Sequence, residues 1–101
     1  MRLSPAQIQD IVYTARELVG HDARVWLFGS RVRDDVAGGD IDLLIESAGH
    51  VEQPVWLAAR VSAGLQRKLG ERRIDVLLVD PQTPREPIHQ VALAEGTLLT
   101  P

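Results

Sequence analysis

Residues 25–31 read VWLFGSR, residues 40–45 read DIDLLI and residues 73–78 read RIDVLL. Each stretch contains a short apolar run of the kind that forms a buried strand, with polar residues at one end of the run. Asp40 and Asp42 are two residues apart, so on a strand their side chains point to the same face. Asp75 is the single acid of the third run. The three stretches therefore predict a sheet that brings carboxylates from two strands together.

These carboxylates indicate a divalent-metal site beside a phosphate site. Like charges on one face of a strand repel each other and need a compensating cation. Mg²⁺ is the natural candidate, because it is usually held by one or two carboxylates together with substrate phosphates. After the first strand, Gly29 lets a ligand approach the backbone, and the Ser30 hydroxyl can bind phosphate oxygens. Arg31 and Arg33 add positive charge at the same place.

Each feature taken alone also has a purely structural interpretation. A Gly-Ser pair after a strand is usually only a turn, an Asp-x-Asp pair is often a surface or capping feature, and single arginines usually face solvent. The combination favours the functional interpretation, because a structural account offers no common cause for three acids placed in or beside apolar strands. The three histidines, in contrast, have no metal-ligand spacing and are interpreted as surface residues.

Composition predicts one small globular domain over residues 1–101. A hydrophobic content of 45% is sufficient for a packed core, and a net charge of −3 gives no general attraction to nucleic acid. The absence of cysteine excludes disulfides and thiolate metal sites. No stretch is long and apolar enough to form a signal sequence or to span a bilayer, so the expected location is the cytoplasm.

Hydrophobic periodicity and capping signals predict helices that alternate with short strands. A capping box at Ser4 and Gln7 begins the first helix, a second helix runs from near Pro54 to Gly70, and a capping box over residues 83–86 begins a third that ends before Gly96. The predicted strands are residues 25–28, 40–46 and 73–79, with a last short one within 97–100. This order predicts an α/β fold in which helices flank a mixed sheet.

The combined motif resembles that of the minimal nucleotidyltransferases, within the DNA polymerase beta-like nucleotidyltransferase superfamily. The resemblance rests on residues 28–30 (FGS), residues 40–43 (DIDL) and Asp75, and it extends over nearly the whole chain. It implies the polymerase beta-like fold and a nucleotidyltransferase that uses ATP and two Mg²⁺ ions. It also implies the roles of the individual residues. The metal-binding and catalytic residues would be Asp40, Asp42 and Asp75, and the nucleotide-binding residues would be Gly29, Ser30, Arg31 and Arg33.

The acceptor is expected to be a hydroxyl group of a partner protein, because the chain has few residues beyond the nucleotidyltransferase core. Minimal nucleotidyltransferases often pair as antitoxins with a helical HEPN-type toxin, and some adenylylate a tyrosine on it. The resemblance thus implies a HEPN-family partner and the transfer of AMP from ATP.

Two alternatives are kept. The chain could be a non-catalytic antitoxin or binding module that acts by occlusion, which Asp34 and Gly39 favour because they depart from the family pattern. It could also be a small-molecule nucleotidyltransferase of the aminoglycoside-modifying type, working as a homo-oligomer. Nucleic-acid polymerisation is disfavoured, since only four residues are aromatic and two of them lie in a strand expected to be buried.

Overall fold

The computed structural model describes residues 3–28, 41–70, 72–84 and 86–100, with the side chains of residues 88, 89, 91 and 92 left out. Its elements alternate between helix and strand, as the sequence predicts. In chain order they are α1 (Pro5–Leu18), β1 (Arg24–Phe28), β2 (Ile41–Glu46), α2 (Pro54–Leu69), β3 (Ile74–Val79), α3 (Pro87–Glu95) and β4 (Thr97–Leu98).

The capping box predicted for the first helix is present. The Ser4 hydroxyl accepts a hydrogen bond from the Gln7 N–H at 3.1 Å, and the Gln7 side chain accepts one from the Ser4 N–H at 2.8 Å. These bonds satisfy two backbone donors that a helix start would otherwise leave unpaired. Pro5 occupies the first helical position, where its missing N–H costs nothing.

The second helix begins and ends where the sequence predicts. Pro54 is its first residue, and Gly70 follows its last. Gly70 has a φ of +91°, which residues with a Cβ rarely adopt, so glycine is the residue that fits this helix end. Leu57, Val61, Leu65 and Leu69 recur at helical spacing and form one apolar stripe. Val61 and Leu65 are fully buried, and Leu57 and Leu69 pack against the same core.

The described strands form one four-stranded sheet in the order β3-β2-β1-β4. β2 pairs with β3 in parallel, whereas β1 pairs antiparallel with both β2 and β4. The sheet is therefore mixed, which confirms the predicted fold class. The last strand of the chain, predicted within residues 97–100, is also confirmed, although it is only two residues long.

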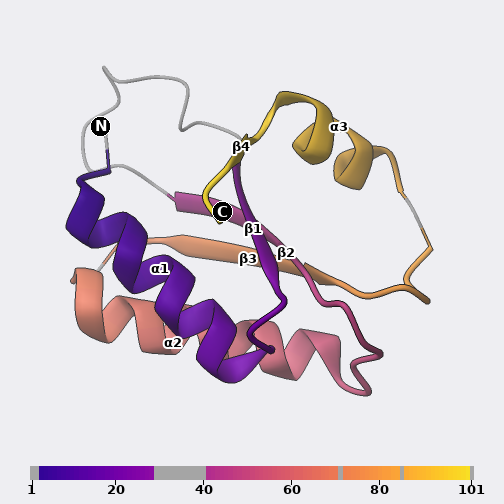
Figure 1. Cartoon of the computed structure of the whole chain (residues 1–101), viewed down its shortest axis with the longest axis horizontal. Helices are drawn as coiled ribbons and strands as arrows, with labels where there is room; N and C mark the ends of the chain where they lie inside the picture. The colour runs from indigo at the N-terminus through magenta and orange to yellow at the C-terminus, as the bar shows by residue number, and fades with distance from the viewer. Residues whose placement is uncertain (1–2, 29–40, 71, 85, 101) are drawn as a thin grey trace.

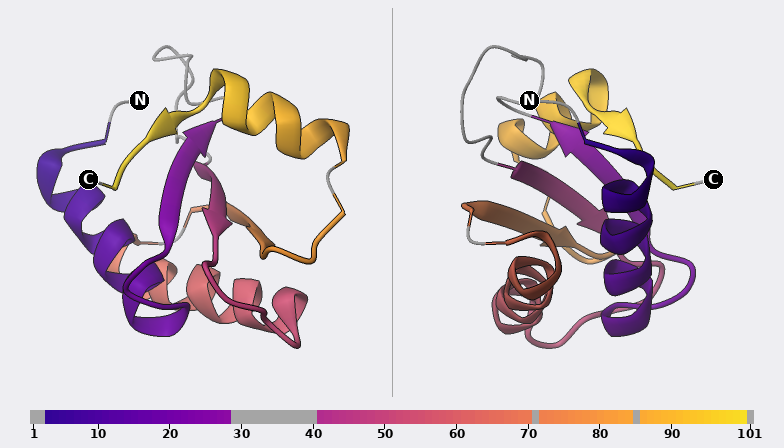
Figure 2. Two further views of the ribbon diagram at one scale, coloured as in Figure 1. Left: turned by 45° about the vertical axis from the view of Figure 1, so that its right-hand side comes forward. Right: turned by 90° about the vertical axis from the view of Figure 1, so that its left-hand side faces the viewer.

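Helices lie on both faces of the sheet (Figures 1 and 2). Of the helices that the structure describes, α1 and α2 pack side by side on one face and α3 lies on the other. The larger core lies under α1 and α2 and includes the fully buried Ile41, Leu43 and Ile45 of β2. A smaller cluster around Leu44 and Val79 lies on the face of α3. None of the described helices is long and apolar enough to cross a membrane.

The predicted beginning of the third helix is wrong. The capping-box pattern predicts a start at Thr83, but α3 begins at Pro87. The Thr83 hydroxyl makes its hydrogen bonds with Asp80 instead. It donates to the Asp80 carboxylate at 3.0 Å and accepts from the Asp80 N–H at 2.9 Å. A threonine hydroxyl can close a turn as readily as it can cap a helix, and here the turn after β3 uses it.

Candidate active site

Asp42 and Asp75 lie directly opposite each other on neighbouring strands. In the parallel pair of β2 and β3, Asp42 is in register with Asp75, as Ile41 is with Ile74. Neighbouring strands lie about 4.8 Å apart, and residues in register on parallel strands point to the same face. Two carboxylates that are separated in sequence by the whole of α2 thus become immediate neighbours in space.

The alternation of side chains along β2 places Asp42 on the face of α3. Ile41 and Leu43, on either side of it, are fully buried in the larger core, whereas Asp42 is half-buried. The carboxylate of Asp75 is more open, with 52% of its side chain exposed. The apolar flanking residues fix the strand on one face, and the two acids remain accessible to a ligand from the other.

The remaining predicted site residues lie outside the described residues. They are Gly29, Ser30, Arg31, Arg33 and Asp40. The structure does describe the residue that precedes the glycine-serine pair in the sequence. Phe28, the residue before Gly29, is paired with Asp42 across the antiparallel strands β1 and β2. The end of β1, the start of β2 and the start of β3 therefore meet at one end of the sheet.

Arg73 supplies a positive charge next to this pair of acids. Its Nε donates to the Asp75 carboxylate at 3.1 Å, and 71% of its side chain is exposed. Ion pairs between exposed groups contribute about 0–1 kcal/mol, because water screens both charges. Arg73 therefore balances part of the local negative charge but can be displaced from Asp75 at little cost.

The donor set fits a hard divalent cation. Two carboxylates on adjacent strands, facing the same side, offer the oxygen ligands that Mg²⁺ prefers, and their mutual repulsion is relieved by a cation between them. Among the residues that the structure describes, no group of three or more potential ligands is found. The third carboxylate that the sequence predicts for the site is Asp40, which directly precedes β2.

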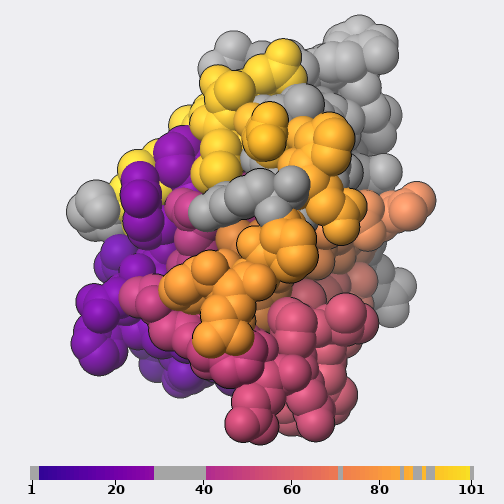
Figure 3. Space-filling model, turned by 90° about the vertical axis from the view of Figure 1, so that its right-hand side faces the viewer, coloured from indigo at the N-terminus to yellow at the C-terminus, as the bar shows by residue number. Residues whose placement is uncertain are grey.

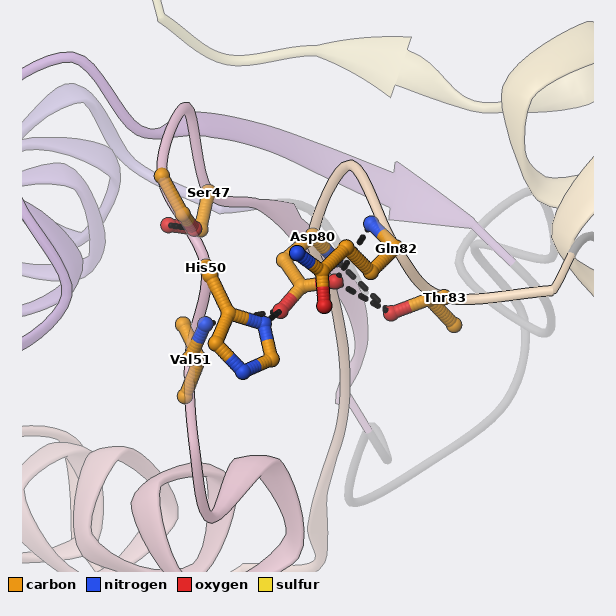
Figure 4. Close-up of polar contacts among 7 residues, drawn as sticks. Ser47, His50, Val51, Asp80, Gln82 and Thr83 are labelled. Atoms are coloured by element: carbon orange, nitrogen blue, oxygen red, sulfur yellow. Dashed lines mark hydrogen bonds and ion pairs between the residues drawn. The ribbon is translucent and has the colours of Figure 1, made fainter.

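Asp80 is a buried carboxylate that the sequence interpretation missed. It follows β3 and is only 7% exposed. Its oxygens accept hydrogen bonds from the Val51 N–H at 2.7 Å, from the Gln82 N–H at 2.8 Å and from Nδ1 of His50 at 2.8 Å, besides the bond from Thr83 (Figure 4). The segment after β2 is thereby tied to the segment after β3, and Figure 3 shows the face on which the two meet.

His50 is a surface residue, as the sequence predicts, since half of its side chain is exposed. Its ring is in addition hydrogen-bonded to Asp80. Because an ionised carboxylate only accepts, Nδ1 of His50 carries the proton that is shared. The Asp80-Pro81-Gln82-Thr83 sequence is a signal for the turn, in which the acid and the threonine bond the backbone and each other, but it does not indicate the contacts of Asp80 with His50 and Val51.

The Asp80 cluster gives the protein an acid-sensitive contribution to stability. The pKa of Asp80 is lowered from 3.8 to about 2, chiefly by the hydrogen bond from the Val51 N–H. A depressed folded-state pKa adds stability that is present above the unfolded pKa and is lost as the pH falls through the folded pKa. We expect Asp80→Asn to be less stable at pH 7 and to lose less stability than the wild type between pH 4 and pH 2. Urea unfolding at a series of pH values measures both effects, and parallel pH profiles for the two proteins would contradict the assignment.

Comparison with known protein families agrees with this geometry. The sequence model of the nucleotidyltransferase domain family matches residues 8–98, which include every predicted site residue. No curated protein matches the chain in sequence. The matched region begins in α1 and ends in β4, so it covers the whole sheet and both acids that the structure brings together. The chain belongs to the nucleotidyltransferase domain family, and its mixed sheet flanked by helices is the fold of the polymerase beta-like superfamily.

Proposed function

We propose that this nucleotidyltransferase transfers a nucleoside monophosphate, with AMP from ATP as the first choice, to a hydroxyl group of a partner protein. The observation that carries the proposal is the register of Asp42 with Asp75, which places two carboxylates side by side in a domain of this family. A nucleotidyltransferase needs such acids in order to bind the divalent cation that neutralises the negative charge of the substrate's triphosphate.

The metal-binding residues in this proposal are Asp42 and Asp75, with Asp40 as the third. Two Mg²⁺ ions bound there would neutralise charge that develops on the triphosphate and lower the pKa of the acceptor hydroxyl. Arg73 leaves Asp75 when the site is loaded, since the ion pair that holds it is exposed and weak.

The remaining residues bind and orient the reactants. The N–H groups and hydroxyl at Gly29 and Ser30 bind the β- and γ-phosphates, with Arg31 and Arg33 as additional cationic partners. The carboxylate of Asp75, the more exposed of the two acids, accepts the proton of the acceptor hydroxyl. The acceptor oxygen then bonds to the α-phosphorus, the bond from that phosphorus to the bridging oxygen breaks, and pyrophosphate leaves.

A protein is the proposed acceptor because the chain belongs to the nucleotidyltransferase domain family and its motif resembles that of the minimal nucleotidyltransferases, some of which modify a partner protein. The partner that the resemblance suggests is a helical HEPN-type toxin, for which this chain would be the antitoxin. Modification of a tyrosine on that toxin would then switch its activity off.

ATP that carries ³²P at either the α- or the γ-phosphate tests this proposal. We expect label from α-³²P-ATP, but none from γ-³²P-ATP, to appear on a HEPN-type protein encoded beside this chain. The transfer should stop when EDTA removes Mg²⁺ and should resume when Mg²⁺ is restored. The other three nucleotides, tested in the same way, establish the base. A stable complex without labelling by any nucleotide would contradict the proposal and would favour a binding module that acts by occlusion.

A further inference from the structure

Among the strands that the structure describes, β3 lies at one edge of the sheet, and one side of its backbone faces away from β2 (Figure 2). The Arg73 carbonyl accepts from the Ile41 N–H at 2.9 Å, and the Val79 carbonyl accepts from the Ser47 N–H at 2.8 Å. Backbone groups alternate in direction along a strand, so the odd-numbered residues of β3 bond to β2. The N–H and C=O groups of the even-numbered residues, from Ile74 to Leu78, therefore lie in the plane of the sheet and point away from β2.

Within the described part of the chain, the outward backbone groups of this edge are only partly hydrogen-bonded. The Ile74 carbonyl accepts a hydrogen bond from the Ser62 hydroxyl of α2 at 2.8 Å. For Val76 and Leu78, no other described residue supplies a partner to the outward backbone groups. An edge with free donors and acceptors is a template for an added strand, and proteins that leave one open commonly use it for binding.

A groove of about 340 Å³ runs along this edge, between β3 and α2. Its α2 side is formed by Val55, which is 84% exposed, and by small side chains that leave room beside the strand. The residues that line it are Pro54, Val55, Ala58, Ala59, Ser62 and Ile74 to Leu78. The groove therefore offers backbone hydrogen bonds along one side and apolar contact along the other.

The groove is continuous with the candidate active site, because Asp75 belongs to both. A strand added to β3 would lie about 4.8 Å from it, with one of its residues in register with Asp75. The side chain of that residue would point to the same face as Asp42 and Asp75. Its two neighbours along the added strand would point to the opposite face, toward α2.

We propose that the acceptor binds as an extended segment that adds a strand to β3, with its hydroxyl-bearing residue in register with Asp75 and apolar residues on either side in the groove. This inference rests on the proposed function and specifies its substrate: a hydroxyl residue between apolar neighbours in an extended, strand-forming segment. Backbone pairing supplies affinity, and the groove supplies selectivity.

A second copy of this chain suits the edge less well. Two β3 strands paired antiparallel near their centres would place Leu77, Val79 or Asp75 of the second copy beside Asp75. None of these residues carries a hydroxyl, and the last arrangement brings two carboxylates together. Such a pairing would cover the candidate site without supplying an acceptor hydroxyl.

A synthetic peptide tests the docking mode without any catalysis. The probe is a nine-residue peptide in which threonine and valine alternate around a central tyrosine, with lysine added at both ends for solubility. We expect the backbone amides of Val76 and Leu78 to exchange hydrogen at least about tenfold more slowly with saturating peptide, as measured by NMR. A peptide N-methylated at the amides that would face β3 is the control, and it should give no protection.

A matched pair of variants tests the groove. Ala59 lines it, whereas Ala63, one helical turn later and also exposed, does not. We expect Ala59→Glu to raise the Kd of the peptide by about tenfold or more, because it places a charge and added volume in the groove, and Ala63→Glu to leave it within about twofold. Binding of ATP, measured by calorimetry, should be the same in both variants.

The outcomes separate this inference from the proposed function. Peptide-dependent protection of Val76 and Leu78 without labelling from α-³²P-ATP on any acceptor would support the docking mode and overturn the transferase activity. Labelling of a partner protein that Ala59→Glu leaves unchanged, without protection of those amides, would overturn the docking mode alone. Protection in the absence of peptide, together with a dimeric mass by light scattering, would assign the edge to a second copy and overturn the inference.

Discussion

Asp42→Asn is expected to lower nucleotidyl transfer by roughly two to three orders of magnitude and to leave the fold intact. A metal ion contributes several kcal/mol of charge stabilisation in the transition state, and each 1.4 kcal/mol corresponds to a factor of ten in rate. Asparagine keeps the shape of Asp42 and removes its charge, so β2 and the core behind it are unaffected. Steady-state transfer of α-³²P label, with a thermal melt of the same sample, measures both quantities.

Glu46→Gln is the matched control for this variant. Glu46 lies on the same strand and the same face as Asp42 but at the other end of β2, where its carboxylate accepts a hydrogen bond from Nε1 of Trp26 at 2.9 Å. The chemical change is the same loss of one carboxylate charge. We expect transfer within about twofold of the wild type. Equal activities for Asp42→Asn and Glu46→Gln would remove Asp42 from the site.

Leu43→Ala is expected to have the largest effect on stability. Leu43 is fully buried in the larger core, and removal of its side chain leaves a cavity that costs about 2–5 kcal/mol. A domain of this size has a total stability of about 5–15 kcal/mol, so the change removes a large fraction of it. Each kcal/mol lowers the Tm of a domain of 60–100 residues by about 4–8 °C. Urea and thermal unfolding, followed by circular dichroism, measure the loss.

Leu98→Ala makes the same chemical change at a more open position. Leu98 lies in β4 at the sheet edge opposite β3 and is 37% exposed. Its neighbours can be rehydrated when the side chain is shortened, so we expect less than half of the cost of Leu43→Ala. Similar losses for the two variants would show that the core does not lie where the fold places it.

Local signals in the sequence predicted the two longer helices correctly. The capping box at Ser4 and Gln7, and the proline and glycine that flank α2, act within a few residues of the helix ends, so their effect can be read without knowledge of the fold. The same kind of signal failed at Thr83, because Asp80 competes for its hydroxyl. A local pattern decides the structure only where no neighbour in the turn offers an alternative partner.

The register of the two acids could not be derived from strand patterns alone. The apolar runs predict that β2 and β3 exist and carry acids, but strand order and register depend on how the helices cover the sheet. The strand patterns and the resemblance to a family supplied the expectation that Asp42 and Asp75 share a site, and the register between them is the part that the structure adds. The assignments of Gly29, Ser30 and Asp40 remain predictions.

Asp80 was missed for a related reason. An aspartate after a strand and before a proline is an ordinary turn residue, and nothing in its local sequence distinguishes it from an exposed one. Its burial results from the approach of residues 50 and 51, which lie 30 and 29 positions earlier in the chain. A contact over that distance has no local signature, which is why the cluster emerged only from the folded chain.

The alternation of acid and apolar residues along β2 also constrains how this chain can change. Insertion or deletion of a single residue in the strand would exchange its two faces, so that Asp42 would turn into the apolar interior and its buried neighbours would turn to solvent. Such a change would destabilise the fold itself, besides displacing Asp42 from the candidate site. Libraries that vary this enzyme by length rather than by substitution should therefore yield unfolded proteins when the change lies within residues 41–46, and the acids can be repositioned only by changing loops.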